Sequence, residues 1–499
     1  MLAALLQQAF DSPQVDFHAL APELVLTGAL VVVLLADLFK PAGARGIVPQ
    51  IAGIGILAAL VPVLTLALDG ADRSMFSGAY VVDNFALVLK ALFLLAAYVV
   101  VLLSTNYIAE GDYAEGEYYF LLLSSLLGMT VMASARDLIT IFVALELLSI
   151  PAYMLAGWRK RDLHGNEAGV KYYLMGVFAS AVMLYGMSLL FGASGSTLLS
   201  DIASSPNVAM ADSTPFVTLG VVLVVIGFAF KVSAVPFHTW APDTYEGAPT
   251  PVTAFLAVLS KTAGFVALLQ LILIAFSARS DVIEPLMWVL SALTMTVGNL
   301  IALRQTNIIR MLAYSGVAQA GFMLAPLAVV GSNADGAQQA VITYLLIYAA
   351  MNLGAFAVVL AVARKTRSAE ISTWGGLFEY APGLTVLMTL FLFSLAGIPP
   401  LGGWLAKFVV FRSLLEPDVT AWGVTLAIVV GVNSVIALYY YANVARTMWM
   451  DPVPDGDTTP VRVPFSLGAA LAVSITLTVA FGVSNLATRF GDLATFIPT

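Results

Sequence analysis

The chain contains no cysteine and only three histidines among its 499 residues. Without thiolates it cannot hold a cysteine-bound iron–sulfur cluster, form a disulfide or use a cysteine nucleophile. The histidines, His18, His164 and His238, are too scattered in the sequence to suggest a metal or bis-histidine haem site. We therefore expect no electron carrier, no metal and no other cofactor in this chain.

Charge is also scarce, since 10% of the residues are charged whereas 60% are hydrophobic. That composition does not fit a soluble globular domain and predicts a polytopic membrane protein. The net charge of -8 argues against a nucleic-acid partner, and neither a glycine-rich dinucleotide turn after a strand nor a P-loop is present. The first 23 residues lack the basic region of a cleavable signal, so we expect the first span to remain in the mature protein.

Apolar runs of about 20 residues mark the expected membrane spans. They predict an all-α polytopic membrane protein with about fourteen transmembrane helices, at 22–39, 47–68, 84–105, 118–135, 138–157, 169–193, 216–240, 250–277, 285–303, 308–331, 337–363, 383–412, 421–447 and 465–486. Prolines interrupt the seventh span, at Pro236 and Pro242, and the twelfth, at Pro399 and Pro400. Helices 7 and 12 are therefore predicted to be broken.

The basic residues of the loops predict the orientation. Loops after odd-numbered spans carry twelve lysines and arginines, whereas the other loops, the C-terminal tail and the nearby Arg412 carry five. Because cytoplasmic loops are enriched in basic residues, both termini are expected outside the cytoplasm. Lys90 lies about seven residues from the outer end of its helix, so we expect its side chain to extend to the surface.

Four other lysines, Lys171, Lys231, Lys261 and Lys407, lie well inside apolar runs. Glu146 is the one carboxylate at a comparable depth. A charged side chain near the centre of a membrane helix costs about 2.5 to 3.5 kcal/mol on insertion scales. Packing alone gives no reason for that cost, so these residues are the first candidates for function.

Lysine suits proton transfer in such a setting. The ordinary pKa of its ammonium group is near 10.4, and desolvation lowers this value whereas a neighbouring carboxylate raises it. We therefore expect Glu146 and Lys231 to form a switchable ion pair. Lys261, His238 and Lys407 are expected to be further stations of a proton path.

Structural alternatives exist for several of these residues. The pair of Glu146 with Lys231 could only lock two helices together, and His238 could be a neutral group that satisfies a broken helix end. Asp243 and Glu246, near the polar end of the first break, are expected to be cap or loop ligands.

The two predicted breaks share a short sequence frame. Pro236 to Trp240 and Pro400 to Trp404 both read Pro-x-x-x-Trp. The breaks are five spans apart, an odd number, so related segments would cross the membrane in opposite directions, as in an inverted-topology repeat. A helix breaks inside a membrane only where its freed backbone groups face protein or water, which suggests a hydrated cavity at each break. Chance, or a shared need for a kink, is the alternative.

The longest motif runs from Phe230 to Asp243, continues from Tyr245 to Leu256 and ends at Lys261. It resembles the antiporter-like membrane subunits of respiratory complex I. Supporting matches are Glu146 to Tyr153, Lys171 to Gly176, and Ala396 to Trp404 followed by Lys407 and Phe408. The resemblance spans helices 4 to 13, and the run Tyr-Glu-Gly-Ala-Pro-Thr-Pro-Val is typical of the family's N branch rather than of its L and M branches.

The resemblance implies two inverted five-helix repeats, helices 4–8 and 9–13. The chain then divides into 1–117, 118–277 with the first repeat, 278–447 with the second, and 448–499 with helix 14. In that family a glutamate on helix 5 pairs with a lysine on helix 7, and lysines on helices 8 and 12 continue a hydrated central axis.

These roles fall on Glu146, Lys231, Lys261 and Lys407, and Lys171 matches the lysine of helix 6. One departure is Gln319, where many relatives carry histidine. A glutamine can orient water but cannot titrate.

The implied function is proton translocation within an NADH:quinone oxidoreductase, with FMN, iron–sulfur clusters and quinone in other subunits. The implied neighbours are subunits K and M, with the lateral helix of subunit L along one side. The implied location is the bacterial inner membrane, multi-pass, with both termini periplasmic. One alternative is a subunit of a multi-protein sodium/proton antiporter, in which activity would follow sodium instead of NADH. Another is a purely structural subunit.

Overall fold

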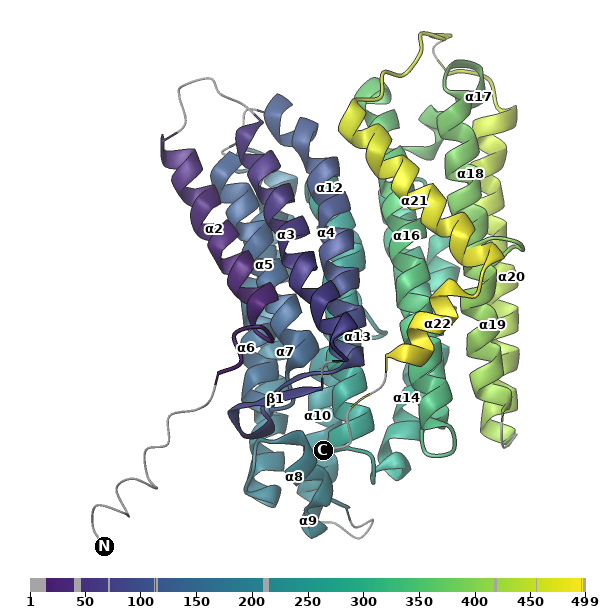
Figure 1. Cartoon of the computed structure of the whole chain (residues 1–499). Coiled ribbons are helices and arrows are strands. Elements are labelled where there is room, and N and C mark those ends of the chain that lie inside the picture. Colours follow the sequence, from purple (N-terminus) through teal and green to yellow (C-terminus); the bar gives the residue numbers. More distant parts are fainter. Residues whose placement is uncertain are drawn as a thin grey trace, which may run out of the picture.

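The computed structural model describes residues 15–39, 46–70, 72–111, 113, 115–209, 215–416, 420–454, 456–494 and 496. Long helices lie side by side and run between two ends of the molecule (Figure 1). The strands described are β1 (Arg73–Met75) and β2 (Tyr80–Val82), which pair antiparallel. The prediction of an all-α polytopic membrane protein is confirmed.

The helices follow one another along the chain with short connections. The first part contains α2 (Ala21–Phe39), α3 (Ile47–Leu68), η1 (Phe76–Gly78), α4 (Asn84–Glu110), α5 (Glu115–Ser134), α6 (Leu138–Ala156), α7 (Leu163–Ser194), α8 (Leu199–Ser204), α9 (Pro206–Ala209), α10 (Pro215–Lys231), α11 (Trp240–Gly247), α12 (Thr250–Phe255), η2 (Leu256–Ser260), α13 (Lys261–Gln270) and η3 (Leu271–Ala275). The second contains α14 (Ser280–Ala302), α15 (Ile308–Leu324), η4 (Ala325–Val329), α16 (Ala334–Thr366), η5 (Ile371–Trp374), α17 (Leu377–Tyr380), α18 (Pro382–Ala396), α19 (Gly402–Leu415), α20 (Ala421–Met450), α21 (Phe465–Val483) and α22 (Leu486–Leu493).

We call the end of the bundle where α8, α9 and the β1–β2 hairpin lie the terminal face, because α2 begins there and Phe496, the last residue described, packs on Arg136 there (Figure 1). The other end, where α17 lies, is the opposite face.

Twelve helical segments of the described chain are long and apolar enough to cross a membrane. Two further crossings are shorter apolar helices, α10 and α18, each continued by a second helix after an interruption. The predicted bounds of several spans are too short, as at α7, which begins at Leu163 and not at residue 169. Its first turn is polar but is capped by Asp162, whose carboxylate accepts a hydrogen bond from the His164 amide. Hydropathy finds the apolar part of a helix, whereas the cap sets its end.

Both predicted breaks are confirmed. Helix α10 ends at Lys231 and α11 begins at Trp240, and the connecting turn holds Ser233 at φ +62°. Helix α18 ends at Ala396, where Gly397 adopts φ +91°, a conformation that favours glycine. Each break frees the backbone groups of a helix end inside the bundle.

The most enclosed helices lie at the centre of the bundle. The membrane-length window of α16 is entirely buried, and those of Ile308–Val329 and Thr250–Ala275 are 94% and 89% buried. By contrast, α2, α3, α7, α20 and α21 are buried over one third of their windows and form part of the perimeter. The inner helices therefore provide the environment in which buried charge is most costly.

The prediction that Lys90 extends to the surface is wrong. Its side chain is fully buried, and Nζ lies 2.9 Å from Glu23 Oε1 and donates a hydrogen bond of 2.9 Å to the Tyr80 hydroxyl. The reason is that α2 and β2 cover this end of α4 and supply both partners. A second buried pair, Arg136 with Asp83 at 2.8 Å, lies at the same terminal face.

Candidate functional site: the buried lysine axis

Three of the predicted lysines are buried where a helix is interrupted. Lys231, Lys261 and Lys407 are 3%, 2% and 4% exposed. Lys231 is the last residue of α10, Lys261 follows the π-helical turn η2, and Lys407 lies on α19 just after the second break. Such interruptions leave backbone N–H and C=O groups that a regular helix would pair with one another.

Lys231 is held by hydroxyl groups at the first break. Its Nζ donates to Ser149 Oγ at 2.8 Å and to the Tyr172 hydroxyl at 3.4 Å. The Tyr172 ring stacks on Trp240, with centroids 4.4 Å apart, and the Trp240 indole donates to the Phe230 carbonyl at 3.0 Å. The Phe230 carbonyl also accepts a hydrogen bond from the Ser233 amide at 3.0 Å, so Trp240 adds a second donor at the end of α10. Trp404, its counterpart in the Pro-x-x-x-Trp frame, is 44% exposed, so the shared frame does not give equivalent tryptophan environments.

Glu146 does not contact Lys231 directly. Its carboxylate accepts a 2.6 Å hydrogen bond from Ser180 Oγ, and within the described part of the chain no carboxylate lies within 4.0 Å of Lys231 Nζ. Ser149, which does bind Lys231, lies three residues after Glu146 on α6. The predicted partner Glu146 and the observed partner Ser149 thus lie on one turn of α6, but the predicted ion pair is open in this conformation.

Lys261 donates to the Gly316 carbonyl of α15 at 2.5 Å. A Cβ atom added at Gly316 would lie 3.3 Å from Lys261 Nζ and 3.2 Å from the Tyr348 hydroxyl oxygen. Glycine at this position therefore lets the ammonium group and the tyrosine hydroxyl approach the same point of the α15 backbone.

Lys407 rests on a carbonyl exposed by the second break. Its Nζ donates to the Ala396 carbonyl at 2.6 Å and lies 4.7 Å from the centre of the Phe322 ring. Ala396 is the last residue of α18, so its carbonyl has no partner in a next helical turn. Lys407 therefore donates a hydrogen bond to a carbonyl that the break has left without a backbone partner.

Gln319 occupies the space between helices α15, α16, α18 and α20. Its amide nitrogen donates to the Leu395 carbonyl at 3.0 Å and to the Tyr441 hydroxyl at 3.3 Å, and its amide oxygen accepts from the Tyr344 hydroxyl at 2.5 Å. Sequence reasoning identified Gln319 as a departure but missed both tyrosines. Buried tyrosines are common in apolar cores, so only the contact with Gln319 sets these two apart.

Lys171 is not deep, contrary to the prediction. Its side chain is 43% exposed, and Nζ lies 2.7 Å from both Glu167 and Asp243. Because α7 begins at Leu163, Lys171 lies just over two turns from the opposite face. Asp243 also pairs with Arg310 at 3.0 Å, so this expected loop ligand ties α11 to two helices.

His238 lies in the first break and is 8% exposed. Its Nδ1 has no hydrogen-bond partner among the described residues. The same holds for other buried polar atoms on either side of the break and on helix α13: Ser233 Oγ, Thr244 Oγ1, the Tyr245 hydroxyl and Thr262 Oγ1. Buried polar groups of this kind are ordinarily hydrogen-bonded to protein or water, which favours a hydrated interior at the first break.

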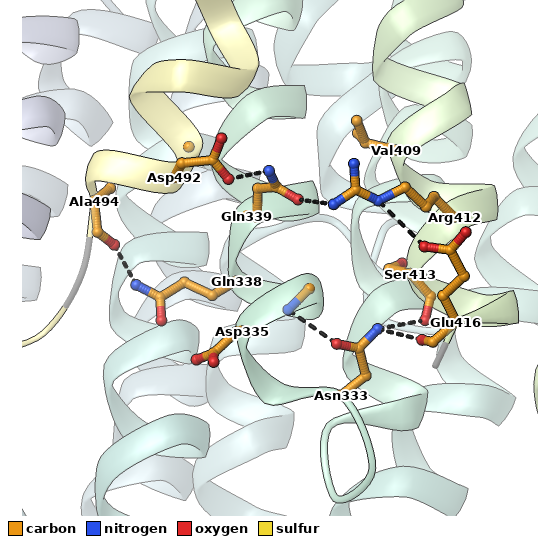
Figure 2. A pocket seen from close by; sticks show the side chains of 12 residues that line it. Asn333, Asp335, Gln338, Gln339, Val409, Arg412, Ser413, Glu416, Asp492 and Ala494 are labelled. Atoms are coloured by element: carbon orange, nitrogen blue, oxygen red, sulfur yellow. Dashed lines mark hydrogen bonds and ion pairs between the residues drawn. The ribbon is translucent and has the colours of Figure 1, made fainter. Parts of the chain in front are cut away.

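A polar cavity of about 440 Å³ opens at the terminal face, between α16, α19 and α22 (Figure 2). Arg412, five residues after Lys407 on α19, donates to Gln339 Oε1 at 3.3 Å and lies 3.6 Å from Glu416. Gln339 donates in turn to Asp492, and Gln338 to the Ala494 carbonyl. Hydrogen bonds from two glutamine side chains of α16 therefore hold α22 and the residues after it at the cavity.

The described part of the chain contains no group of three or more histidine, aspartate or glutamate side chains placed to hold a metal ion.

A helical membrane bundle with two broken helices and buried lysines at the interruptions defines an antiporter-like membrane subunit. The family model described as NADH:quinone oxidoreductase/Mrp antiporter, TM, matches residues 135–437. NADH-quinone oxidoreductase subunit N of Trichlorobacter lovleyi is 41% identical over 462 residues, which cover 92% of this chain and 93% of that relative. The chain belongs to this family, in its subunit N branch.

Solved structures agree with that assignment. A chain of respiratory complex I from Thermus thermophilus, solved with bound aureothin, is 32% identical and superposes with a TM-score of 0.75 over 93% of this chain and 97% of that one. A chain of the Mrp complex from Dietzia sp. superposes with a TM-score of 0.82 over 96% of both chains at 22% identity, which shows the shared fold alone.

Proposed function

We propose that this chain is a proton-translocating membrane-arm subunit of a bacterial NADH:quinone oxidoreductase. The observation that carries the proposal is the set of three buried lysines, each at a helix break or a π-helical turn. Each is bonded to hydroxyl or carbonyl oxygens, with no carboxylate of the described residues in contact. An amine that rests on neutral acceptors can lose its proton without leaving an unpaired carboxylate behind. The relative from Trichlorobacter lovleyi, 41% identical, is named as a subunit of NADH-quinone oxidoreductase, and we propose that proton transfer in this chain takes place in such a complex.

The turn of α6 that holds Glu146 and Ser149 is the proposed switch. When Glu146 approaches Lys231, its negative charge favours the ammonium form, and when it turns to Ser180, as in this structure, the proton on Lys231 is less strongly held. Moving one proton against 100 mV takes about 2.3 kcal/mol. Opening one buried ion pair involves energies of this order or larger, so a single switch of this kind can drive one transfer step.

The proton path that this proposal requires begins at the opposite face. Lys171 and His238 are the proposed entry residues, since Lys171 is half-exposed and His238 has a free ring nitrogen beside the broken helix. From Lys231 the path continues to Lys261 and Lys407. The polar cavity beside Arg412 is the proposed exit at the terminal face.

The architecture proposed for this path is a pair of inverted repeats. They are the predicted membrane helices 4–8 and 9–13, counted as spans along the sequence, within segments 118–277 and 278–447. Segment 1–117 precedes them and segment 448–499 follows. The two broken crossings, five spans apart, support this division. The excess of basic residues in the loops of the opposite face supports a cytoplasmic location for that face, with both termini periplasmic in the bacterial inner membrane.

The redox chemistry is proposed to lie in other subunits, which hold FMN, the iron–sulfur clusters and the quinone. Subunits K and M are the proposed neighbours, with the lateral helix of subunit L along one side. Energy from quinone reduction would then reach Glu146 through contacts between subunits.

The replacement Lys231→Ala in the intact complex tests the proposal. After assembly has been confirmed, NADH-driven quinone reduction and proton uptake are measured in inverted membrane vesicles. We expect both rates to fall at least about tenfold, since the amine is an obligatory carrier. Lys160→Ala, which removes a lysine that is 78% exposed, is the matched control. Unchanged activities in Lys231→Ala would reduce the buried amine to a structural feature.

The fold shared with the Mrp complex keeps a sodium/proton antiporter subunit as the second candidate. In that case vesicles would exchange protons in response to a sodium gradient without NADH. Proton uptake that requires NADH and is unaffected by removal of sodium would exclude it.

A further inference from the structure

A cluster of buried hydroxyl groups lies between Lys261 and Lys407. It comprises Ser315 of α15, Tyr344 of α16 and Tyr441 of α20, gathered around Gln319, and each of the four residues is at most 1% exposed. The hydroxyls of Ser315 and Tyr441 are 2.5 Å apart. Four polar side chains are thus buried together in the most enclosed part of the bundle, although none of them carries a charge.

One end of the cluster reaches the Lys261 site through the α15 backbone. Ser315 is followed directly by Gly316, whose carbonyl accepts the hydrogen bond from Lys261 at 2.5 Å. An ammonium group that leaves the Gly316 carbonyl therefore has the Ser315 hydroxyl one residue away along the same helix.

The other end reaches the Lys407 site through the freed carbonyls of α18. Gln319 donates to the Leu395 carbonyl at 3.0 Å, and Lys407 donates to the next carbonyl, that of Ala396, at 2.6 Å. At the second break, Gln319 and Lys407 therefore donate hydrogen bonds to the carbonyls of two consecutive residues.

The amide of Gln319 cannot gain or lose a proton under ordinary conditions, but it can fix the hydrogen bonds of its neighbours. Its nitrogen donates to the Tyr441 oxygen, which can accept a second hydrogen bond from Ser315. The hydroxyl hydrogen of Tyr441 is then available for transfer toward Lys407. Hydroxyl groups can accept a proton on oxygen and release their own, which an amide does not do.

We propose that Ser315 and Tyr441, oriented by Gln319, relay protons from Lys261 to Lys407. The ammonium group of Lys261 loses one proton and the amine of Lys407 gains one. Ser315 and Tyr441 each accept one proton on oxygen and release the one they held, so neither changes its net charge. This relay rests on the proposed function and specifies how its path crosses from Lys261 on α13 to Lys407 on α19.

Tyr441→Phe in the intact complex tests the relay, because it removes one hydroxyl and keeps the ring. Inverted membrane vesicles are assayed for NADH-driven proton uptake in ordinary and in heavy water, after the amount of assembled complex has been measured. We expect uptake to fall at least about tenfold and the solvent isotope effect to rise, since proton transfer becomes the slow step. Ser315→Ala removes the other hydroxyl of the same bond and is expected to reproduce both changes, which keeps the test valid if Tyr441→Phe does not assemble.

Tyr118→Phe is the matched control. Tyr118 is fully buried, and its hydroxyl is 2.9 Å from that of Ser104, so it has the same chemistry away from the lysines. We expect uptake within twofold of the unmodified complex. Equal effects of the two tyrosine replacements, or normal uptake in Tyr441→Phe, would overturn the relay.

Lys261→Ala separates the two proposals. If Lys261→Ala abolishes uptake while Tyr441→Phe and Ser315→Ala leave it normal, the pump stands and the relay is wrong. If Lys261→Ala has no effect, the proposed function itself is wrong.

Discussion

Single buried charges carry most of the functional information in this chain. Three lysines that the sequence placed inside apolar runs are buried, and each binds a hydroxyl or carbonyl oxygen atom of another helix or helix end. Lys90 and Lys171 were misplaced because depth along a sequence does not show which neighbours cover a side chain. Lys90 is enclosed by α2 and β2, whereas Lys171 lies nearer a helix end than the apolar run indicated.

The ion pair of Lys90 with Glu23 predicts a specific stability effect. Glu23→Gln leaves an uncompensated buried ammonium group, so we expect a loss of about 3 to 5 kcal/mol. Adding Lys90→Met removes that charge, and we expect the double replacement to recover most of the loss. The measurement is thermal unfolding of the solubilised complex for both single replacements and the double one. A double replacement that is as unstable as the sum of the singles would show that the pair is not coupled.

At the scale of elements, the second broken helix determines where Lys407 and Gln319 bind. The sequence predicted both breaks from proline, but it could not show that Ala396 and Leu395 would offer their freed carbonyls to Lys407 and Gln319. It also could not show that Lys231 would bind the Ser149 hydroxyl while Glu146 binds Ser180. These contacts depend on how separate helices pack, which a hydropathy pattern does not specify.

Gly403 is predicted to be essential to the second break. A Cβ atom at this position would lie 1.7 Å from the Ser394 carbonyl oxygen, which belongs to the backbone of α18 and cannot turn away. We therefore expect Gly403→Ala to push α19 away from α18 and to lower the free energy of unfolding by about 3 kcal/mol.

Gly383→Ala on α18 is the control for that prediction, since no atom lies within 4 Å of its added Cβ. The abundance and thermal stability of the assembled complex are the measurements. Equal behaviour of the two alanine variants would contradict the close contact at Gly403.

At the scale of the whole molecule, composition predicted the membrane bundle, and the motifs from residues 230 to 261 predicted its family. In the described part of the chain, the fourteen predicted apolar runs correspond to twelve helices of membrane length and the two interrupted crossings that begin with α10 and α18, because each run must bury its backbone polar groups within a helix. The hydroxyl cluster around Gln319 was beyond the sequence, since its members come from α15, α16 and α20.

The rate of NADH-driven proton uptake tests the central claim most directly, measured in inverted vesicles with Lys261→Ala in an assembled complex. Lys261 is buried and binds a backbone carbonyl, so its removal deletes a carrier without breaking a contact between charged groups. We expect NADH-driven uptake to be lost, with Lys160→Ala at the rate of the unmodified complex. An unchanged rate of uptake in Lys261→Ala would contradict proton transfer along the buried lysines.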